Sequence, residues 1–194
     1  MDDPCEEKAR EALRRAADSR REGRLDEARD AYRSAADGFR ALGRGGELVQ
    51  AMCGQARIER DAGRLDLALA LQEDALVAAR RLDDARQLAH VLRHLGEILD
   101  ACGRPTESEL YFVEMLRLYR SFDGVPPLEM ANVIRSMADH REKTGNKTEA
   151  IALWRDARQR YAALDTLFAE LTGKTFNPGT AEADRRLARL LRET

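Results

Sequence analysis

The sequence contains few aromatic residues, few cysteines and no long apolar run. Aromatic residues make up only 5% of the 194 residues. The three cysteines are an odd number without a CxxC motif, which argues against a disulfide scaffold and favours reduced thiols. No apolar segment approaches the roughly 20 residues that span a bilayer, and the acidic N-terminus has no signal-peptide core. We therefore expect a soluble, cytoplasmic protein that inserts into no membrane.

An excess of charge of one sign is also missing. The chain has 33 Lys and Arg against 35 Asp and Glu, and these charges are spread evenly along it. Nucleic-acid binding needs clustered basic residues to neutralise phosphates, so we expect no nucleic-acid partner. The charged residues that are present, 35% of the chain, accompany many Ala and Leu residues. This composition is typical of long helices with charged surfaces.

A short phrase recurs along the chain. It reads GRLDEARD from Gly23 and GRLDLALA from Gly63, with looser copies from Gly103 and Gly145, so the gaps are 40, 40 and 42 residues. Apolar residues on both sides of Gly63 recur at helical spacing. Glycine ends helices because it adopts the left-handed C-cap conformation without steric cost. The phrase therefore predicts a tight turn between two helices, repeated along the chain.

The repeat predicts four antiparallel helix pairs followed by one further helix. The predicted pairs are 4–22 with 25–41, 47–62 with 65–82, 84–102 with 105–122, and 127–144 with 147–170. The segment GKTFNPGT, residues 173–180, is predicted as a loop. Residues 180–192 form a last helix with Ala183, Leu187, Leu190 and Leu191 on one face. A repeat array exposes apolar surface at its end, so we interpret this helix as a cap. The domains are thus 1–171 (pairs 4–41, 47–82, 84–122 and 127–170) and 172–194 (loop and capping helix).

Aligning the four copies on the glycine shows a common packing pattern. Five residues after each glycine stand the small residues Ala28, Ala68, Ser108 and Ala150, and nine after it stand Tyr32, Gln72, Phe112 and Trp154. This pattern resembles the tetratricopeptide repeat over roughly residues 9–165. The family's usual period is about 34 residues, so the longer period here is similar to repeats of the kinesin-light-chain type. The resemblance implies an all-α, right-handed α-solenoid of antiparallel helix pairs with a C-terminal capping helix.

The resemblance also implies a binding groove, because the first helix of each pair lines the concave face in this family. The register places polar residues on that face, Arg20 and Arg60 among them. The predicted groove residues are Gln50, Arg57, His90, Arg93, His94, Glu97, Asn132, Arg135 and Asp139. Arginine forks recognise carboxylates, so these residues favour an acidic protein or peptide segment as the partner.

An alternative interpretation is that these charges only neutralise one another on solvated helix faces. Arg57 and Asp61, Arg93 and Glu97, and Arg135 and Asp139 are all spaced i, i+4. Such exposed pairs contribute only a few tenths of a kcal/mol each. If they form, mutation of the arginines should hardly change folding.

No residue pattern indicates catalysis or a cofactor. His90 and His94 have a spacing that a metal ion can use, but no further ligand adjoins them, so we predict a hydrogen-bonding or pH-sensitive pair and no metal. TGKT at 172–175 lacks the preceding glycine of a phosphate loop. We expect His140 and Cys5 to be exposed.

The leading hypothesis from the sequence is a non-catalytic scaffold that binds a protein or peptide. Two alternatives stay open, namely a ligand- or peptide-gated regulatory module and a self-assembly module. The oligomeric state, monomer or dimer, and the identity of the partner are not specified by these residues.

Overall fold

The computed structural model describes residues 3–172 and 178–192, and these form helices joined by short turns. No strand occurs in these two ranges, which confirms the predicted all-α class. The helices are α1 (Pro4–Arg21), α2 (Leu25–Ala41), α3 (Gly45–Asp61), α4 (Leu65–Ala79), α5 (Ala85–Ala101), α6 (Pro105–Tyr119), α7 (Pro127–Lys143), α8 (Lys147–Thr172) and α9 (Pro178–Arg192).

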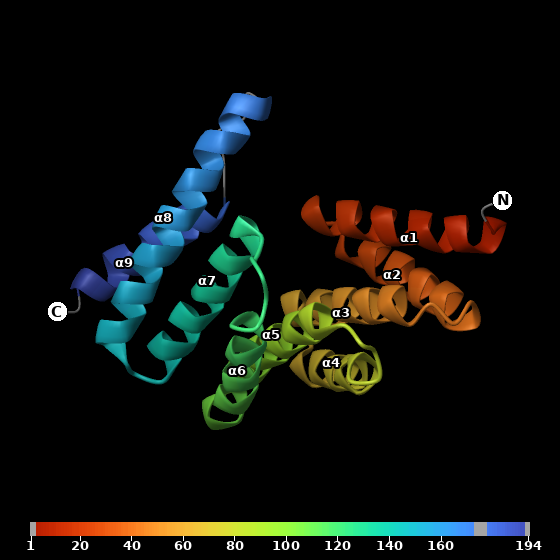
Figure 1. The fold of residues 1–194 in the computed structure, drawn as a ribbon, viewed down its shortest axis with the longest axis horizontal. Helices are drawn as coiled ribbons and strands as arrows, with labels where there is room; N and C mark the ends of the chain where they lie inside the picture. The colour runs from red at the N-terminus through yellow and green to blue at the C-terminus, as the bar shows by residue number, and fades with distance from the viewer. Residues whose placement is uncertain (1–2, 173–177, 193–194) are drawn as a thin grey trace. The chain divides into compact units, whose positions relative to one another are not determined.

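The chain divides into two compact units, Met1–Arg120 and Ser121–Thr194. Unit 1 holds three helix pairs, α1 with α2, α3 with α4 and α5 with α6, and each pair also contacts the next one. Unit 2 holds the pair α7 and α8, with α9 packed against α8 (Figure 1). Consecutive pairs of this kind are the building blocks of an α-solenoid.

The turn glycines end the first helix of each pair as the sequence predicts. Gly63 has a φ of 76°, which L-residues with a side chain rarely adopt. Its N–H donates to the carbonyl of Arg60 at 2.9 Å, and the N–H of Arg64 donates to the carbonyl of Glu59 at 2.8 Å. These two hydrogen bonds satisfy carbonyls that would otherwise lack partners at the helix end. Gly23, Gly103 and Gly145 share the positive φ.

The small and large residues of the repeat occupy the helix crossings. Ala28, Ala68, Ser108 and Ala150 are fully buried, and so are Phe112 and Trp154, with Tyr32 nearly so, which confirms the alignment on the glycine. Gln72 replaces the aromatic residue in the second copy and is also fully buried. Its amide Nε2 donates to the carbonyl of Val91 at 2.9 Å, so a hydrogen bond between α4 and α5 accompanies the loss of apolar packing.

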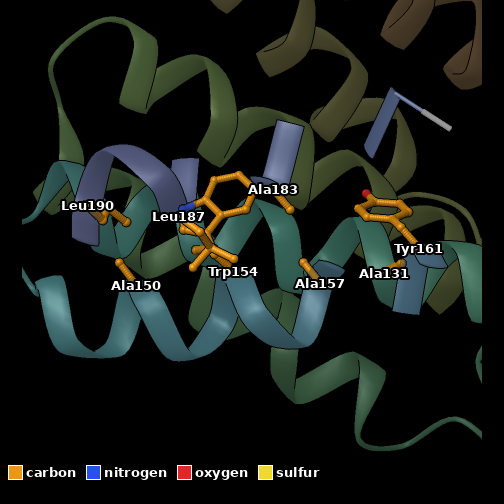
Figure 2. Packing of buried hydrophobic residues seen from close by; sticks show 9 residues of the cluster. Ala131, Ala150, Trp154, Ala157, Tyr161, Ala183, Leu187 and Leu190 are labelled. Carbon is orange, nitrogen blue, oxygen red and sulfur yellow. The ribbon is translucent and has the colours of Figure 1, made fainter. Parts of the chain in front are cut away.

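The capping helix covers the end of unit 2. In α9, Ala183, Leu187 and Leu190 pack into one cluster with Trp154 and Tyr161 of α8 (Figure 2). Leu191 was predicted on the same face but is half exposed, so the apolar stripe is narrower than expected. The helix begins at Pro178, two residues before the predicted start. Residues 173–177, predicted as loop, lie outside the described residues.

His140 is buried and not exposed, contrary to the prediction. It stands five residues before Gly145, where the second and third copies carry Ile58 and Ile98. All three side chains are fully buried. The position therefore faces the core in each of these copies, whatever the polarity of its residue.

Candidate functional site

The predicted groove residues fall in both units, and each unit is described by itself. Unit 1 contains Gln50 and Arg57 on α3, and His90, Arg93, His94 and Glu97 on α5. Unit 2 contains Asn132, Arg135 and Asp139 on α7. In unit 1, α3 contacts both α1 and α5, so side chains from these three helices meet on one face. We call it the α1–α3–α5 face.

Glu97 is the centre of a buried polar network on this face. Its carboxylate accepts from Arg93 Nη1 at 2.8 Å on the same helix and from Arg60 Nη1 at 2.9 Å on α3. His94 Nδ1 lies 3.0 Å from the same carboxylate. Glu97 is only 8% exposed and Arg93 only 6%. The predicted pair of Arg93 and Glu97 is therefore confirmed, but the expectation that it is exposed and weak is wrong.

The hydrogen bonds of His94 define its protonation. Arg93 Nη2 lies 3.0 Å from His94 Nε2, and because a guanidinium only donates, this nitrogen accepts. The Nδ1–H then donates to Glu97. Burial, reinforced by Arg93, holds the pKa of His94 well below its ordinary value, which matches the neutral ring. Both ring nitrogens are engaged, so His94 has no lone pair left for a metal ion.

His90 lies one helical turn before His94, and the two rings meet edge to face with centroids 4.5 Å apart. Burial lowers the pKa of His90 to about 4, and Arg93 and Arg57 add to that shift. Within the described residues, no cluster of three or more His, Cys, Asp or Glu side chains suits a metal ion. The two histidines are thus neutral polar groups beside the arginines.

Asp61 is the second carboxylate of this face. It pairs with Arg20 of α1 at 3.3 Å and with Arg60 at 3.1 Å. The predicted pair of Arg57 with Asp61 does not form. The carboxylate, at the last residue of α3, bridges two helices and so takes its cations from α1 and from its neighbour in sequence.

Arg57 consequently lacks an ion-pair partner. Its Nε is buried without an acceptor, whereas its two Nη atoms are not closed off in this way. Burial lowers the pKa of Arg57 to about 10, with Arg20, Arg60 and Arg93 adding to the shift and Glu97 opposing it. A guanidinium remains charged at this pKa at neutral pH. Arg57 is therefore a half-buried cation surrounded mainly by other cations.

We call Arg20, Arg57, Arg60 and Arg93 the arginine cluster. It carries four positive charges and contacts two carboxylates, Asp61 and Glu97. His90 and His94 are neutral and add no charge. Sequence register placed all four arginines on this face and paired Glu97 correctly with Arg93, but it assigned Asp61 to the wrong arginine. Gln50, also predicted here, is exposed on α3.

The predicted residues of unit 2 have partners within that unit. Asn132 accepts from the hydroxyl of Tyr161 at 2.7 Å. Arg135 lies 3.7 Å from Glu182 of α9. Asp139 pairs with Lys143 at 2.7 Å and with Arg186 of α9 at 2.9 Å, so the predicted pair of Arg135 with Asp139 is wrong.

Comparisons with known proteins agree with this architecture. Residues 47–121, which include most of α3 and all of α4 to α6, match the tetratricopeptide repeat family. No helix among the described residues is both long and apolar enough to cross a membrane. A search of curated proteins finds no significant match.

Solved structures with a similar fold include kinesin-light-chain repeats. The crystal structure of nearly identical TPR-like repeats of a kinesin light chain from Podosopora anserina superposes with a TM-score of 0.65 at 16% identity, covering 99% of this chain and 88% of that one. BtubC (BKLC) from P. vanneervenii gives a TM-score of 0.53 at 16% identity, covering 99% and 92%. At these identities the likeness concerns the fold alone.

Proposed function

Because the chain carries tetratricopeptide repeats over residues 47–121, a fold that generally mediates protein–protein interaction, we propose that it is a non-catalytic scaffold whose α1–α3–α5 face binds an acidic segment of a protein partner. The carrying observation is the arginine cluster, in which four cations share two carboxylates and Arg57 has no ion pair. An acidic side chain of a partner can supply the missing acceptor.

The roles on this face differ between residues. Arg57 is the group that meets the partner, because it is only partly buried and its guanidinium has no ion-pair partner among the described residues. Arg60 and Arg93 are held by Glu97 and supply the positive potential from behind. Gln50 is exposed on the same helix as Arg57 and can extend the contact. His90 is a half-buried neutral group beside it, and the buried His94 holds Arg93 and Glu97 in place.

The residues predicted in unit 2 keep a smaller part in this proposal. Asn132 and Asp139 are occupied by Tyr161 and by Arg186, so they hold helices of unit 2 together. Arg135 is half-buried and pairs at 3.7 Å with Glu182. We propose that these three residues pack α7 against α8 and α9 and that the partner contacts lie on unit 1.

The test is affinity capture from the source cell followed by titration of each captured protein. Wild type is compared with Arg57→Glu and with the control Arg33→Glu, which reverses an exposed arginine of α2 that only approaches Asp30 at 3.6 Å. A charge-assisted contact contributes about 1.5–3 kcal/mol, so Arg57→Glu should weaken binding by roughly tenfold or more. High salt should weaken wild type in the same direction. Equal affinity of all three proteins would contradict the proposal.

A further inference from the structure

We propose that Arg57, with Arg20 beside it, forms a subsite for a doubly charged oxyanion of the phosphate class. This inference deepens the proposed function, and it rests on the α1–α3–α5 face as the binding surface. It specifies which chemical group of an acidic ligand is held there, and by which arginines.

The first argument is the charge balance of the arginine cluster. Arg20, Arg57, Arg60 and Arg93 contribute four positive charges, and Asp61 and Glu97 contribute two negative ones. Two positive charges therefore remain. A carboxylate would neutralise only one of them, whereas a phosphate monoester near neutral pH carries close to two negative charges.

The second argument is the distribution of this charge among the four arginines. Arg60 and Arg93 both bind Glu97, and Arg60 also binds Asp61. Arg20 has a single partner, Asp61, at the long distance of 3.3 Å. Arg57 has no partner. The excess charge thus belongs to Arg57 and Arg20.

The third argument is the fit between the free donors and the ligand. The Nε atoms of Arg57, Arg20 and Arg93 are all buried without an acceptor. Both Nη atoms of Arg93 are engaged, by Glu97 and His94, so Arg57 and Arg20 are the under-bonded guanidinium groups. The Nη atoms of Arg57 are not closed off, so an oxyanion reaches them from outside. Phosphate presents three strong acceptor oxygens, and the planar fork of a guanidinium matches two of them at once.

Glu97 acts as a positioning residue in this arrangement. It engages Arg60 and Arg93 in direct ion pairs, so the charges of these two arginines are already partnered. Without it, four guanidinium groups would compete for the same ligand and repel one another. Because Glu97 binds two of the arginines, Arg57 and Arg20 remain as the two ligands of the oxyanion.

The experiment uses the whole chain and needs no identified partner. Thermal unfolding is followed in inorganic phosphate, in acetate and in chloride at pH 7.5 and equal ionic strength. A second arm adds phosphoserine capped at both ends. Proteins are wild type, Arg57→Met and the control Arg33→Met. Phosphate stabilises many proteins by exclusion from their surface, and the matched variants subtract that general effect.

We expect phosphate to raise the melting temperature of wild type and of Arg33→Met by about 2–4 °C more than acetate does, since a ligand that binds only the folded state stabilises it. Arg57→Met should lose this difference. A response to capped phosphoserine as well as to phosphate assigns the source as a phosphorylated side chain, and a response to phosphate alone assigns it as free phosphate. An equal response to acetate, or an undiminished one in Arg57→Met, overturns the subsite.

A measurement on wild type alone covers the case in which Arg57→Met does not fold. The arginine Nε–Hε signals in a ¹⁵N spectrum should include shifts that saturate with phosphate and stay small with acetate. Arg57→Lys keeps the charge but lacks the guanidinium fork, so its phosphate response should be weaker than that of wild type. Failure of these tests would leave the proposed protein-binding face untouched, because that face is tested by partner capture.

Discussion

The carboxylates on the first helix of each helix pair have different partners in the two units. In unit 2, Glu142 of α7 is bound by Arg186 at 3.0 Å, by Arg189 and by the indole N–H of Trp154 at 3.2 Å. Two of these donors come from α9. In unit 1 the equivalent donors outnumber the acceptors, and Arg57 is left over. In unit 2, α9 supplies arginines that neutralise the carboxylate of α7. On the α1–α3–α5 face of unit 1, an external ligand would have to supply the anion that neutralises Arg57.

Among the variants considered, removal of the Glu97 carboxylate should lower the free energy of unfolding most. Glu97→Gln leaves Arg60 and Arg93 without their shared partner in a buried position. Loss of one partner of a buried ion pair costs about 3–5 kcal/mol. Urea unfolding of the variant measures this cost directly.

The control for this prediction is Glu107→Gln, which removes a carboxylate that pairs only with exposed Arg104. It should leave the free energy of unfolding almost unchanged. A Glu97→Gln cost as small as that of the control would mean that the network on unit 1 contributes little to stability.

Acidification should also weaken unit 1. The pKa of His94 is lowered well below its usual value by burial and by Arg93, so the unfolded chain binds the proton first as pH falls. Stability is present above about pH 6.5 and is lost below it. Between pH 7.5 and 5, wild type should lose about 2 kcal/mol more than His94→Gln, measured by urea unfolding at each pH. Parallel pH profiles of the two proteins would show that His94 titrates normally.

Removal of the Glu142 carboxylate in unit 2 should lower the free energy of unfolding less than removal of Glu97 in unit 1. Glu142 is well buried, but its partners Arg186 and Arg189 are about a third and a half exposed, so water can replace part of what they lose. We expect Glu142→Gln to cost about 1–2 kcal/mol in urea unfolding. A cost above that of Glu97→Gln would reverse the ranking of the two units.

Replacement of Arg57 should have the smallest effect, and of opposite sign. Methionine keeps the apolar stem and removes a cation that has no partner. We expect Arg57→Met to change the free energy of unfolding by less than about 1 kcal/mol, in the stabilising direction. The matched change in unit 2, Arg186→Met, removes pairs to Asp139 and Glu142 and should destabilise. Destabilisation by both would show that Arg57 has a partner within the chain.

The sequence specified the helices and their packing better than the pairing of charges. Glycine turns and the residues five and nine positions after them depend on local geometry, which a fixed period reveals. The same alignment contained the signal for His140, since Ile58 and Ile98 occupy its position, but its polarity concealed the burial. Polar character alone is a weak guide where hydrogen bonds are available inside the fold.

Spacing of i, i+4 predicted the pair of Arg93 with Glu97 but not the partners of Asp61 and Asp139. Asp61 turns to Arg20 and Arg60, and Asp139 turns to Arg186, so partners from other helices displace those on the same helix. The arginine side chain is long enough to reach several carboxylates, and the packing of the helices determines which one lies closest. The free guanidinium of Arg57 is therefore visible only in three dimensions.

The position of Trp154 makes unit 2 optically separable. It is the only tryptophan of the chain, it is fully buried, and the guanidinium carbon of Arg186 lies 5.6 Å from its ring centroid. Its fluorescence therefore reports the packing of α8 and α9 and is silent about α1 to α6. Circular dichroism averages over all the helices. Superimposable denaturation curves from the two signals would show that both units unfold as one cooperative block, and an early fluorescence transition would show that the capped end unravels first.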